Sequence, residues 1–256
     1  MKIPLFLFAS MLWVCNPLSG QNESGPRQTK ILVLAEEEGL HAPFVEAAKD
    51  WLKQTGKECH FTVDFIPNAD PVNDSFLLAY SIIIQLNYPP YGWPPEAAKA
   101  FQNYITQGRG GWIGFHHAAL LGEFDGYPLW TWFSEFMGGI RYENYIADFA
   151  SGLVKNEFPT HPCMQNIPMT FTIDSEEWYA WDRAPGDGVR ILASVDETSY
   201  RPPSNLKMGF HPVVWTNEKM KARNVYIFMG HHASLFQNPA FTTLFRNSIS
   251  WTAGNQ

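Results

Sequence analysis

Charge is scarce in this sequence, and positive charge is the scarcer sign. Charged residues make up 17% of the 256 residues, with 18 Lys and Arg against 25 Asp and Glu, for a formal net charge of −7. No strongly basic stretch is present, which argues against a nucleic-acid partner, because phosphate backbones require one. Hydrophobic residues make up 45%, as is typical of a compact globular protein rather than a disordered chain.

Cysteine and the common nucleophile motifs are also scarce. The chain has three cysteines, no CxxC or zinc-finger spacing, and no GxSxG. Neither Cys59 nor Cys163 follows a buried strand at a strand-to-helix elbow, so a cysteine nucleophile is not expected. In an oxidising compartment these two cysteines could pair, but they do not make a disulfide framework.

A stretch long and apolar enough to cross a membrane is lacking, but a shorter one stands at the N-terminus. Lys2 precedes the apolar run 3–14, and Ser19-Gly20 supplies small residues before Gln21. This pattern predicts a signal peptide at residues 1–20 and an exported protein, periplasmic or secreted. Residues 21–29 are expected to be a flexible lead-in. The run is too short for a comfortable transmembrane helix, so no membrane span is expected in the mature chain. Cys15 admits a lipoprotein alternative, which the bulky residues before it disfavour.

The rest of the chain, residues 30–254, reads as a single α/β domain. Apolar runs at 30–35, 61–66, 81–86 and 111–115 predict strands, and helical periodicity at 42–54 and 95–107 predicts helices between them. This alternation favours a mostly parallel sheet covered by helices. Gly56 is expected to end the first helix. Further strands are predicted at 149–154, 169–173, 177–181, 189–195 and 208–216, with helices at 130–136 and 239–251.

Histidines gather where the predicted strands end. The run WIGF ends in His116-His117, the run VYIFMG ends in His231-His232, and His41 follows the first strand. Because ligands usually bind at the carboxyl ends of parallel strands, these histidines mark a candidate site. Adjacent residues of a strand point in opposite directions, so one histidine of each pair is expected to face the pocket. Gly230 would allow close approach of backbone or ligand.

Acid–base chemistry and metal binding are both open to these residues. General acid–base work needs a group that titrates near neutrality or a carboxylate with a raised pKa, which makes His116, His231 and Glu177 the catalytic candidates. Imidazoles and carboxylates also suit zinc and related divalent metals, although HH is not a metal signature. The carboxylates available near the histidines are Glu36, Glu37, Glu38, Asp174, Glu176 and Glu177. The segment 174–179 places carboxylates beside aromatic rings, a mixture found in sugar sites.

Several segments together resemble the ThuA-like family of trehalose-utilisation proteins. They are ILVLA at 31–35, GRGGWIGFHHAA at 108–119, MGG at 137–139, THP at 160–162, EEWY at 176–179, HPVVW at 211–215, NVYIFMGHH at 224–232 and FRNSISW at 245–251. The resemblance implies a class I glutamine amidotransferase-like fold, that is, a flavodoxin-like three-layer sandwich, here with added antiparallel strands. It implies a role in carbohydrate metabolism, with pocket positions His41, His116, Glu177 and His231 and with Tyr179 nearby. Phe115-His116-His117 stands where amidotransferases carry their cysteine, so glutaminase activity is not expected.

The function predicted from these observations is action on a sugar or sugar derivative, a disaccharide or keto-sugar, by histidine and glutamate acid–base chemistry. The alternatives are a non-catalytic carbohydrate-binding protein and an amidotransferase-like hydrolase with an unrecognised nucleophile. Substrate-binding positions are expected at His41, His117, Trp178, Tyr179 and His232. If a divalent metal such as zinc is present, the expected ligands are His41, His116 and His231. The aromatic surface is consistent with a homodimer.

Overall fold

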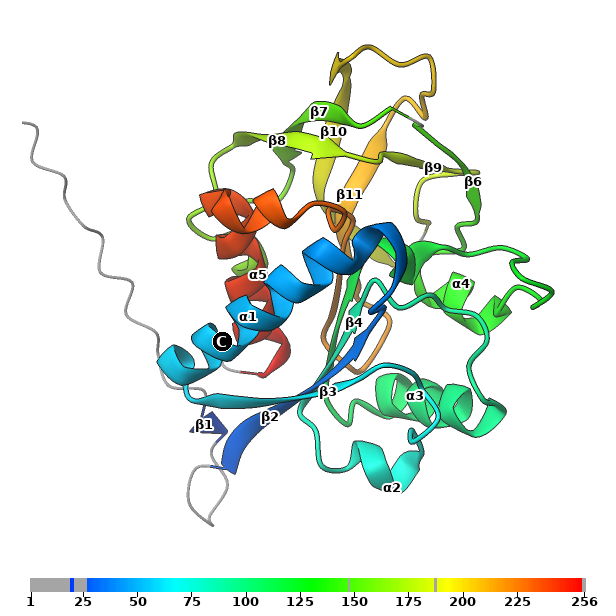
Figure 1. Ribbon diagram of the computed structural model, residues 1–256, viewed down its shortest axis with the longest axis vertical. Helices are drawn as coiled ribbons and strands as arrows, with labels where there is room; N and C mark the ends of the chain where they lie inside the picture. Colours follow the sequence, from blue (N-terminus) through cyan, green and yellow to red (C-terminus); the bar gives the residue numbers. More distant parts are fainter. Residues whose placement is uncertain (1–18, 21–26, 147, 187, 255–256) are drawn as a thin grey trace, which may run out of the picture.

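The computed structural model describes residues 19–20, 27–146, 148–186 and 188–254 (Figure 1). Most of the predicted signal peptide and of the lead-in therefore lies outside the described residues. Within the lead-in, β2 (Arg27–Ala35) begins at Arg27, three residues before the predicted start of the strand. The short strand β1 (Ser19–Gly20) pairs antiparallel with its first residues.

One half of the main sheet is parallel, as predicted. The order of its parallel strands is β3-β2-β4-β5-β12. Besides β2, these strands are β3 (Phe61–Ile66), β4 (Ile82–Leu86), β5 (Gly111–Phe115) and β12 (Asn224–Ile227). Every residue of β4, β5 and β12 is buried. This burial on both faces explains why their sequences are continuous apolar runs rather than alternating ones. Their carboxyl ends lie at one edge of the sheet.

The other half of the sheet is antiparallel. From β12 the order continues β11-β10-β7-β8, with β11 (His211–Asn217), β10 (Val189–Arg201), β7 (Ala150–Asn156) and β8 (Thr170–Glu176). A separate pair joins β6 (Tyr142–Tyr145), which was not predicted, to β9 (Tyr179–Trp181). This half brings the end of β8, and with it the EEWY segment, to the same edge as the ends of β5 and β12.

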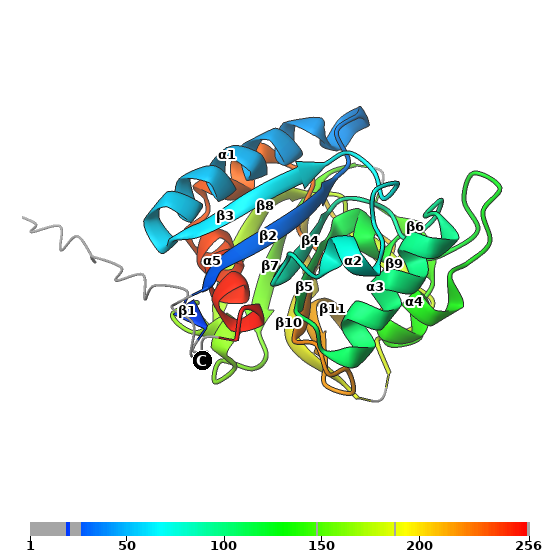
Figure 2. The same cartoon turned by 90° about the horizontal axis from the view of Figure 1, so that it is seen from below.

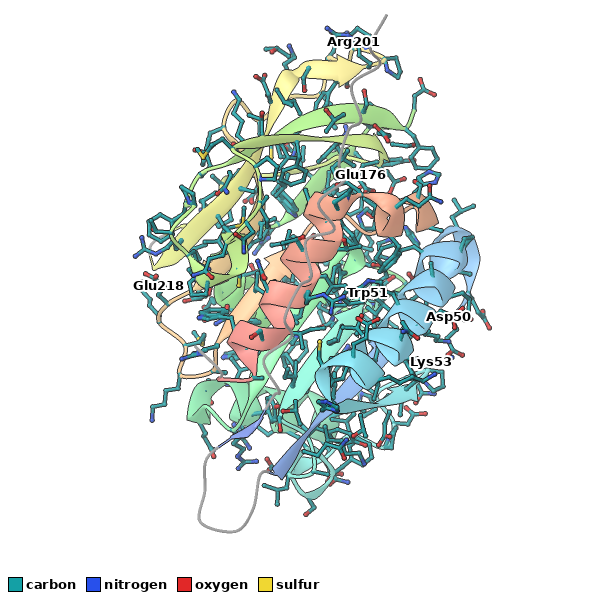
Figure 3. All side chains as sticks on the ribbon, turned by 90° about the vertical axis from the view of Figure 1, so that its left-hand side faces the viewer. Asp50, Trp51, Lys53, Glu176, Arg201 and Glu218 are labelled. Atoms are coloured by element: carbon teal, nitrogen blue, oxygen red, sulfur yellow. The ribbon has the colours of Figure 1, made fainter. Side chains whose placement is uncertain are left out.

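Helices cover both faces of the sheet, which confirms the three-layer sandwich. In Figures 1 and 2, α1 (Ala42–Cys59) and α5 (Pro239–Thr252) lie on one face, and α2 (Asp74–Leu77), α3 (Pro95–Gln107) and α4 (Thr131–Phe136) lie on the other. Trp51 of α1 stacks on Phe245 of α5 with 4.7 Å between ring centroids, while Asp50 and Lys53 lie on the outer side of α1 (Figure 3). Such aromatic pairs contribute about 0.5–1.5 kcal/mol beyond area burial. None of the described helices is both long and apolar enough to span a membrane.

Gly56 does not end the first helix, contrary to the prediction. Helix α1 continues to Cys59, and His60 in the left-handed conformation follows it. Gly56 is buried, and a Cβ there would lie 2.8 Å from the carbonyl oxygen of Phe61. The glycine thus serves close packing of α1 against the start of β3, a role that its sequence position does not reveal.

Cys59 and Cys163 do not form the disulfide that the sequence allowed. Cys163 carries a free, buried thiol in the short 3-10 helix η3 (Pro162–Met164). Burial raises the pKa of this thiol to about 12, so the thiolate is not available for chemistry near neutral pH.

His161 has a structural role at the start of η3. Its Nδ1 atom accepts a hydrogen bond from the backbone N–H of Cys163 at 3.2 Å, and its ring packs on Trp251. Burial lowers the pKa of His161 to about 4, because the charged imidazolium would be desolvated.

The buried, neutral His161 is expected to make stability fall on acidification. The unfolded chain takes up a proton near pH 6.5, whereas the folded chain does so only near pH 4, so stability is lost as the pH falls through this window. The full shift corresponds to about 3 kcal/mol. His161→Asn keeps the capping acceptor without titrating, and between pH 7 and 4.5 it should lose about 2 kcal/mol less unfolding free energy than the wild type. Urea unfolding at both pH values measures this difference, and parallel losses in the two proteins would contradict it.

Candidate functional site

Five histidines meet at the edge of the sheet where the parallel strands end. His41 closes the 3-10 turn η1 (Gly39–His41) that follows β2, and it precedes α1. The other four follow β5 and β12, at His116, His117, His231 and His232. We call these five side chains the histidine cluster. The structure therefore brings together the strand-end histidines that the sequence singled out.

His41 lies at the centre of the cluster. Its ring centroid is 4.0 Å from that of His117, 4.4 Å from that of His231 and 5.0 Å from that of His116. His41, His116 and His231 are each at least nine-tenths buried. At these spacings one small ion or one substrate group can touch several imidazoles at once.

Both His116 and His117 face the cluster, which contradicts the expectation that only one would. His116 has a φ of 41°, so the chain leaves the extended conformation at this residue and enters the turn η2 (His116–Ala119). The alternation of a strand therefore stops at Phe115, and the two imidazoles lie nearly parallel with 5.2 Å between centroids.

Gly230 has the close-approach role that the sequence suggested. A Cβ at this position would lie 2.7 Å from the Cβ atom of His116. The Gly230 carbonyl accepts a hydrogen bond of 2.7 Å from the side chain of Asn87, a buried residue with a φ of 56° just after β4. Asn87 was not predicted as a site residue, although a lone asparagine after an apolar strand is the kind of signal that could have identified it.

Glu36 orients two of the histidines. Its Oε2 atom accepts a 2.8 Å hydrogen bond from Nδ1 of His117 and lies 3.4 Å from Nδ1 of His41. Burial opposes ionisation of Glu36, but the contacts with His117 and His41 outweigh burial and lower the pKa to about 2. With the Nδ1 atoms directed to this carboxylate, the Nε2 atom of His41 faces the cluster, buried and without a partner among the described residues.

Glu176 has a larger structural role than the sequence suggested. Its side chain is fully buried and accepts hydrogen bonds from the backbone N–H groups of Glu177 at 3.0 Å, Gly230 at 3.0 Å and His231 at 3.4 Å. Burial raises the pKa of Glu176 to about 8, although the three N–H groups oppose this rise. Glu176 thus joins the end of β8 to the turn after β12, which carries His231.

Glu177 is the carboxylate that reaches the cluster. Its Oε2 atom lies 3.6 Å from Nε2 of His116, and its side chain is 17% exposed. Burial raises the pKa of Glu177, opposed by the charge of His41 and by a hydrogen bond with Tyr179. Tyr179 is buried, with its ring centroid 4.6 Å from that of His116, so it packs behind the cluster.

Trp178 does not fit the expected role in substrate binding. Its side chain is fully buried, stacks on Phe228 and Tyr200, and donates its indole N–H to the carbonyl oxygen of Ala150. The exposed aromatic ring at the site is instead Phe149, whose ring edge contacts His231 and His232 at centroid distances of 4.6 and 5.0 Å.

Burial favours the neutral form of three imidazoles of the cluster, those of His116, His117 and His231. Burial lowers the pKa of His116 well below its usual value, and the neighbouring histidines lower it further. Burial likewise lowers the pKa of His231 to about 4 and lowers the pKa of His117. Neutral imidazoles carry free lone pairs, so the cluster can accept protons or bind a cation.

Two sets of side chains in the described residues have ligand atoms close enough to hold one metal ion. The first is His41, His116 and His117, and the second is His41, Glu177 and His231, with all ligand atoms of a set within 4.8 Å of one another. The set expected from the sequence, His41 with His116 and His231, is not among them; the ring centroids of His116 and His231 are 5.6 Å apart.

Comparison with models of known protein families shows to which family the chain belongs. A family model described as "ThuA: Trehalose utilisation" matches residues 30–252. The chain belongs to the ThuA family. No curated protein matches it.

Solved structures agree with the assignment to the ThuA family. A protein described as ThuA-like from Bacteroides uniformis is 26% identical with a TM-score of 0.78, and the match covers 91% of this chain and 94% of that one. A second, from Parabacteroides merdae, is 18% identical with a TM-score of 0.60 and coverage of 90% and 91%. A cytoplasmic protein from Salmonella typhimurium shares the fold at 13% identity, with a TM-score of 0.60 and coverage of 88% and 99%.

Proposed function

We propose that this ThuA-family protein acts on a sugar or sugar derivative, a disaccharide or keto-sugar, by proton transfer at the histidine cluster. The observation that carries the proposal is the pairing of a buried neutral imidazole, His116, with the partly exposed carboxyl group of Glu177 at 3.6 Å. The family's description, trehalose utilisation, supports the sugar as substrate class.

His116 is suited to act as the base. Its Nδ1 atom lies 3.2 Å from the carbonyl oxygen of Phe228, so the ring proton belongs on Nδ1 and the lone pair on Nε2. That Nε2 atom is buried and has no hydrogen-bond partner among the described residues. It can therefore take a proton from a carbon next to a sugar carbonyl, while the electron pair of the broken C–H bond moves towards the carbonyl.

Glu177 is suited to act as the acid. Its carboxyl group borders both Nε2 of His116 and the solvent, and burial raises its pKa towards the range in which a carboxyl group can donate. Protonation of the carbonyl oxygen gives isomerisation, and protonation of a leaving oxygen gives elimination. A glycosidase pair is less well supported, because Glu176, the neighbouring carboxyl group, is fully buried and held by three backbone N–H groups.

The proposal includes export. It rests on the same features that predict the signal peptide: Lys2, the apolar run 3–14 and the small residues Ser19 and Gly20. Mass spectrometry of the N-terminus of the protein made in a secreting bacterium would show whether the mature chain begins at Gln21.

The test is deuterium exchange in D2O, because proton removal can be detected without knowing the final product. Trehalose, other disaccharides and their keto derivatives are first tested for binding, and each bound sugar is then followed by NMR and mass spectrometry. With the wild type we expect deuterium at the carbon beside the carbonyl of a bound keto derivative, since trehalose itself has no carbonyl group. His116→Asn should abolish this exchange, since asparagine tolerates the left-handed backbone but cannot take the proton.

The control is His60→Asn, at an exposed left-handed position after α1, which should exchange as the wild type does. Exchange that persists in His116→Asn would overturn the role of His116. A keto-sugar that binds without exchange or product would overturn the proposal and leave a carbohydrate-binding protein.

A further inference from the structure

We propose that His41, Glu177 and His231 bind one divalent transition-metal ion of the zinc type. This inference goes beyond the sugar chemistry above and does not depend on it: Glu177 is a ligand when the ion is bound and can donate a proton only in the metal-free site. It rests on two buried imidazoles with ring nitrogens that lack hydrogen-bond partners among the described residues, and on a partly exposed carboxyl group close to both.

The first observation is the state of the imidazole nitrogens. Nε2 of His41 and both ring nitrogens of His231 are buried and have no partner among the described residues. Leaving a buried polar atom unsatisfied costs about 1–3 kcal/mol, so several in one place call for an explanation. His41 and His231 are 7% and 5% exposed, and their ring centroids are 4.4 Å apart. A bound cation would satisfy these lone pairs.

The second observation is the ligand set. The nitrogen atoms of His41 and His231 and a carboxylate oxygen of Glu177 lie within 4.8 Å of one another. Two ligand atoms of one zinc ion, each about 2.1 Å from the ion, can be at most about 4.2 Å apart. Small side-chain rotations would therefore bring all three ligand atoms within binding distance of one ion. Two imidazoles and one carboxylate are a known zinc ligand set, and three protein ligands leave a position open for water or substrate.

The third observation is the support behind the ligands. Glu36 Oε2 lies 3.4 Å from Nδ1 of His41, which leaves Nε2 to face the metal. Metal-binding histidines usually direct their second nitrogen to such a carboxylate. The backbone N–H of His231 contacts Glu176, which fixes the turn that presents its ring.

The alternative set of three histidines is less suited. It shares His41, and its other two imidazoles are also oriented through Nδ1, His117 by Glu36 at 2.8 Å and His116 by the Phe228 carbonyl. However, three imidazole ligands contribute no negative charge to a buried divalent cation, whereas Glu177 does.

Metal binding to the full purified chain tests the inference. After dialysis against a chelator, Zn²⁺ is titrated by calorimetry and Co²⁺ by its visible absorption. We expect one equivalent of either metal, a cobalt spectrum of low coordination number, and a melting temperature raised by Zn²⁺. His231→Ala and Glu177→Gln should each weaken Zn²⁺ binding by at least about 100-fold, because even residues behind the ligands change affinity by 10- to 100-fold.

The control is His60→Asn, an exposed histidine after α1 and outside the histidine cluster, which should keep one equivalent of metal. Circular dichroism and the melting temperature of each metal-free variant confirm that it is folded. No stoichiometric binding by the wild type would overturn the inference, as would Glu177→Gln binding metal like the wild type. Sugar exchange that fails while metal binding persists would count against the proposed function alone.

Discussion

Glu177→Gln is expected to lower turnover of the sugar substrate by about 100- to 10,000-fold, the usual contribution of a positioned acid or base. The carboxamide keeps the size of the side chain but cannot donate or accept the proton. Because the Glu177 side chain is 17% exposed and forms no part of the hydrophobic core, the melting temperature should stay within a few degrees of the wild type. Rates are measured with the bound sugar identified by the exchange experiment.

Loss of a metal ligand and loss of an acid can be separated for this variant. Rates measured on the metal-free wild type and variant isolate the acid, because neither protein then holds a metal, and Zn²⁺ titration of both proteins measures the role as ligand separately. The matched control is Glu135→Gln, an exposed glutamate of α4, which should leave turnover unchanged. Wild-type turnover in Glu177→Gln, with or without added zinc, would remove Glu177 from the reaction.

Glu176→Ala is expected to reduce the free energy of unfolding by about 3–5 kcal/mol. The substitution leaves the backbone N–H groups of Glu177, Gly230 and His231 without their buried acceptor. It also disconnects β8 from the turn after β12. For a chain of this size the loss corresponds to a fall of roughly 10 °C in melting temperature, measurable by calorimetry.

Asp174→Ala is the matched control for this substitution. Asp174 is an acidic residue of the same strand, two positions earlier, but its side chain is exposed. Its replacement should change stability by no more than about 0.5 kcal/mol. If both variants lose the same stability, the hydrogen bonds to Glu176 do not hold the site together.

The positions of the histidines at the edge of the sheet could be predicted because they depend on local patterns. The buried runs of β2, β4, β5 and β12 are continuous and β-branched, which is what burial on both faces of a parallel sheet requires. Parallel strands end at one edge, so residues that directly follow them must meet there. His41, His116 and His231 were predicted on this basis and lie together.

Two features of the site were not predictable, because each depends on a break in regular geometry. The left-handed conformation of His116 is imposed by its surroundings, and it turns both His116 and His117 towards the cluster. Glu176 faces inward because the pairing of β7 with β8 shifts register between Ala150 and Gly152, which interrupts the alternation of β8. Strict alternation with the buried Ile173 would have directed Glu176 outward.

The sequence by itself therefore determined the α/β class, the parallel core and the edge that carries the histidines, since these follow from periodicity and composition. Only the tertiary structure decided which carboxyl group is enclosed by the scaffold and which borders the histidine cluster. Glu176 and Glu177 are adjacent and identical in type, but one is fully enclosed by backbone N–H groups and the other borders solvent and His116. Their difference comes from burial and hydrogen bonding to distant strands, which determine the chemistry of a carboxyl group and leave no local trace in the chain.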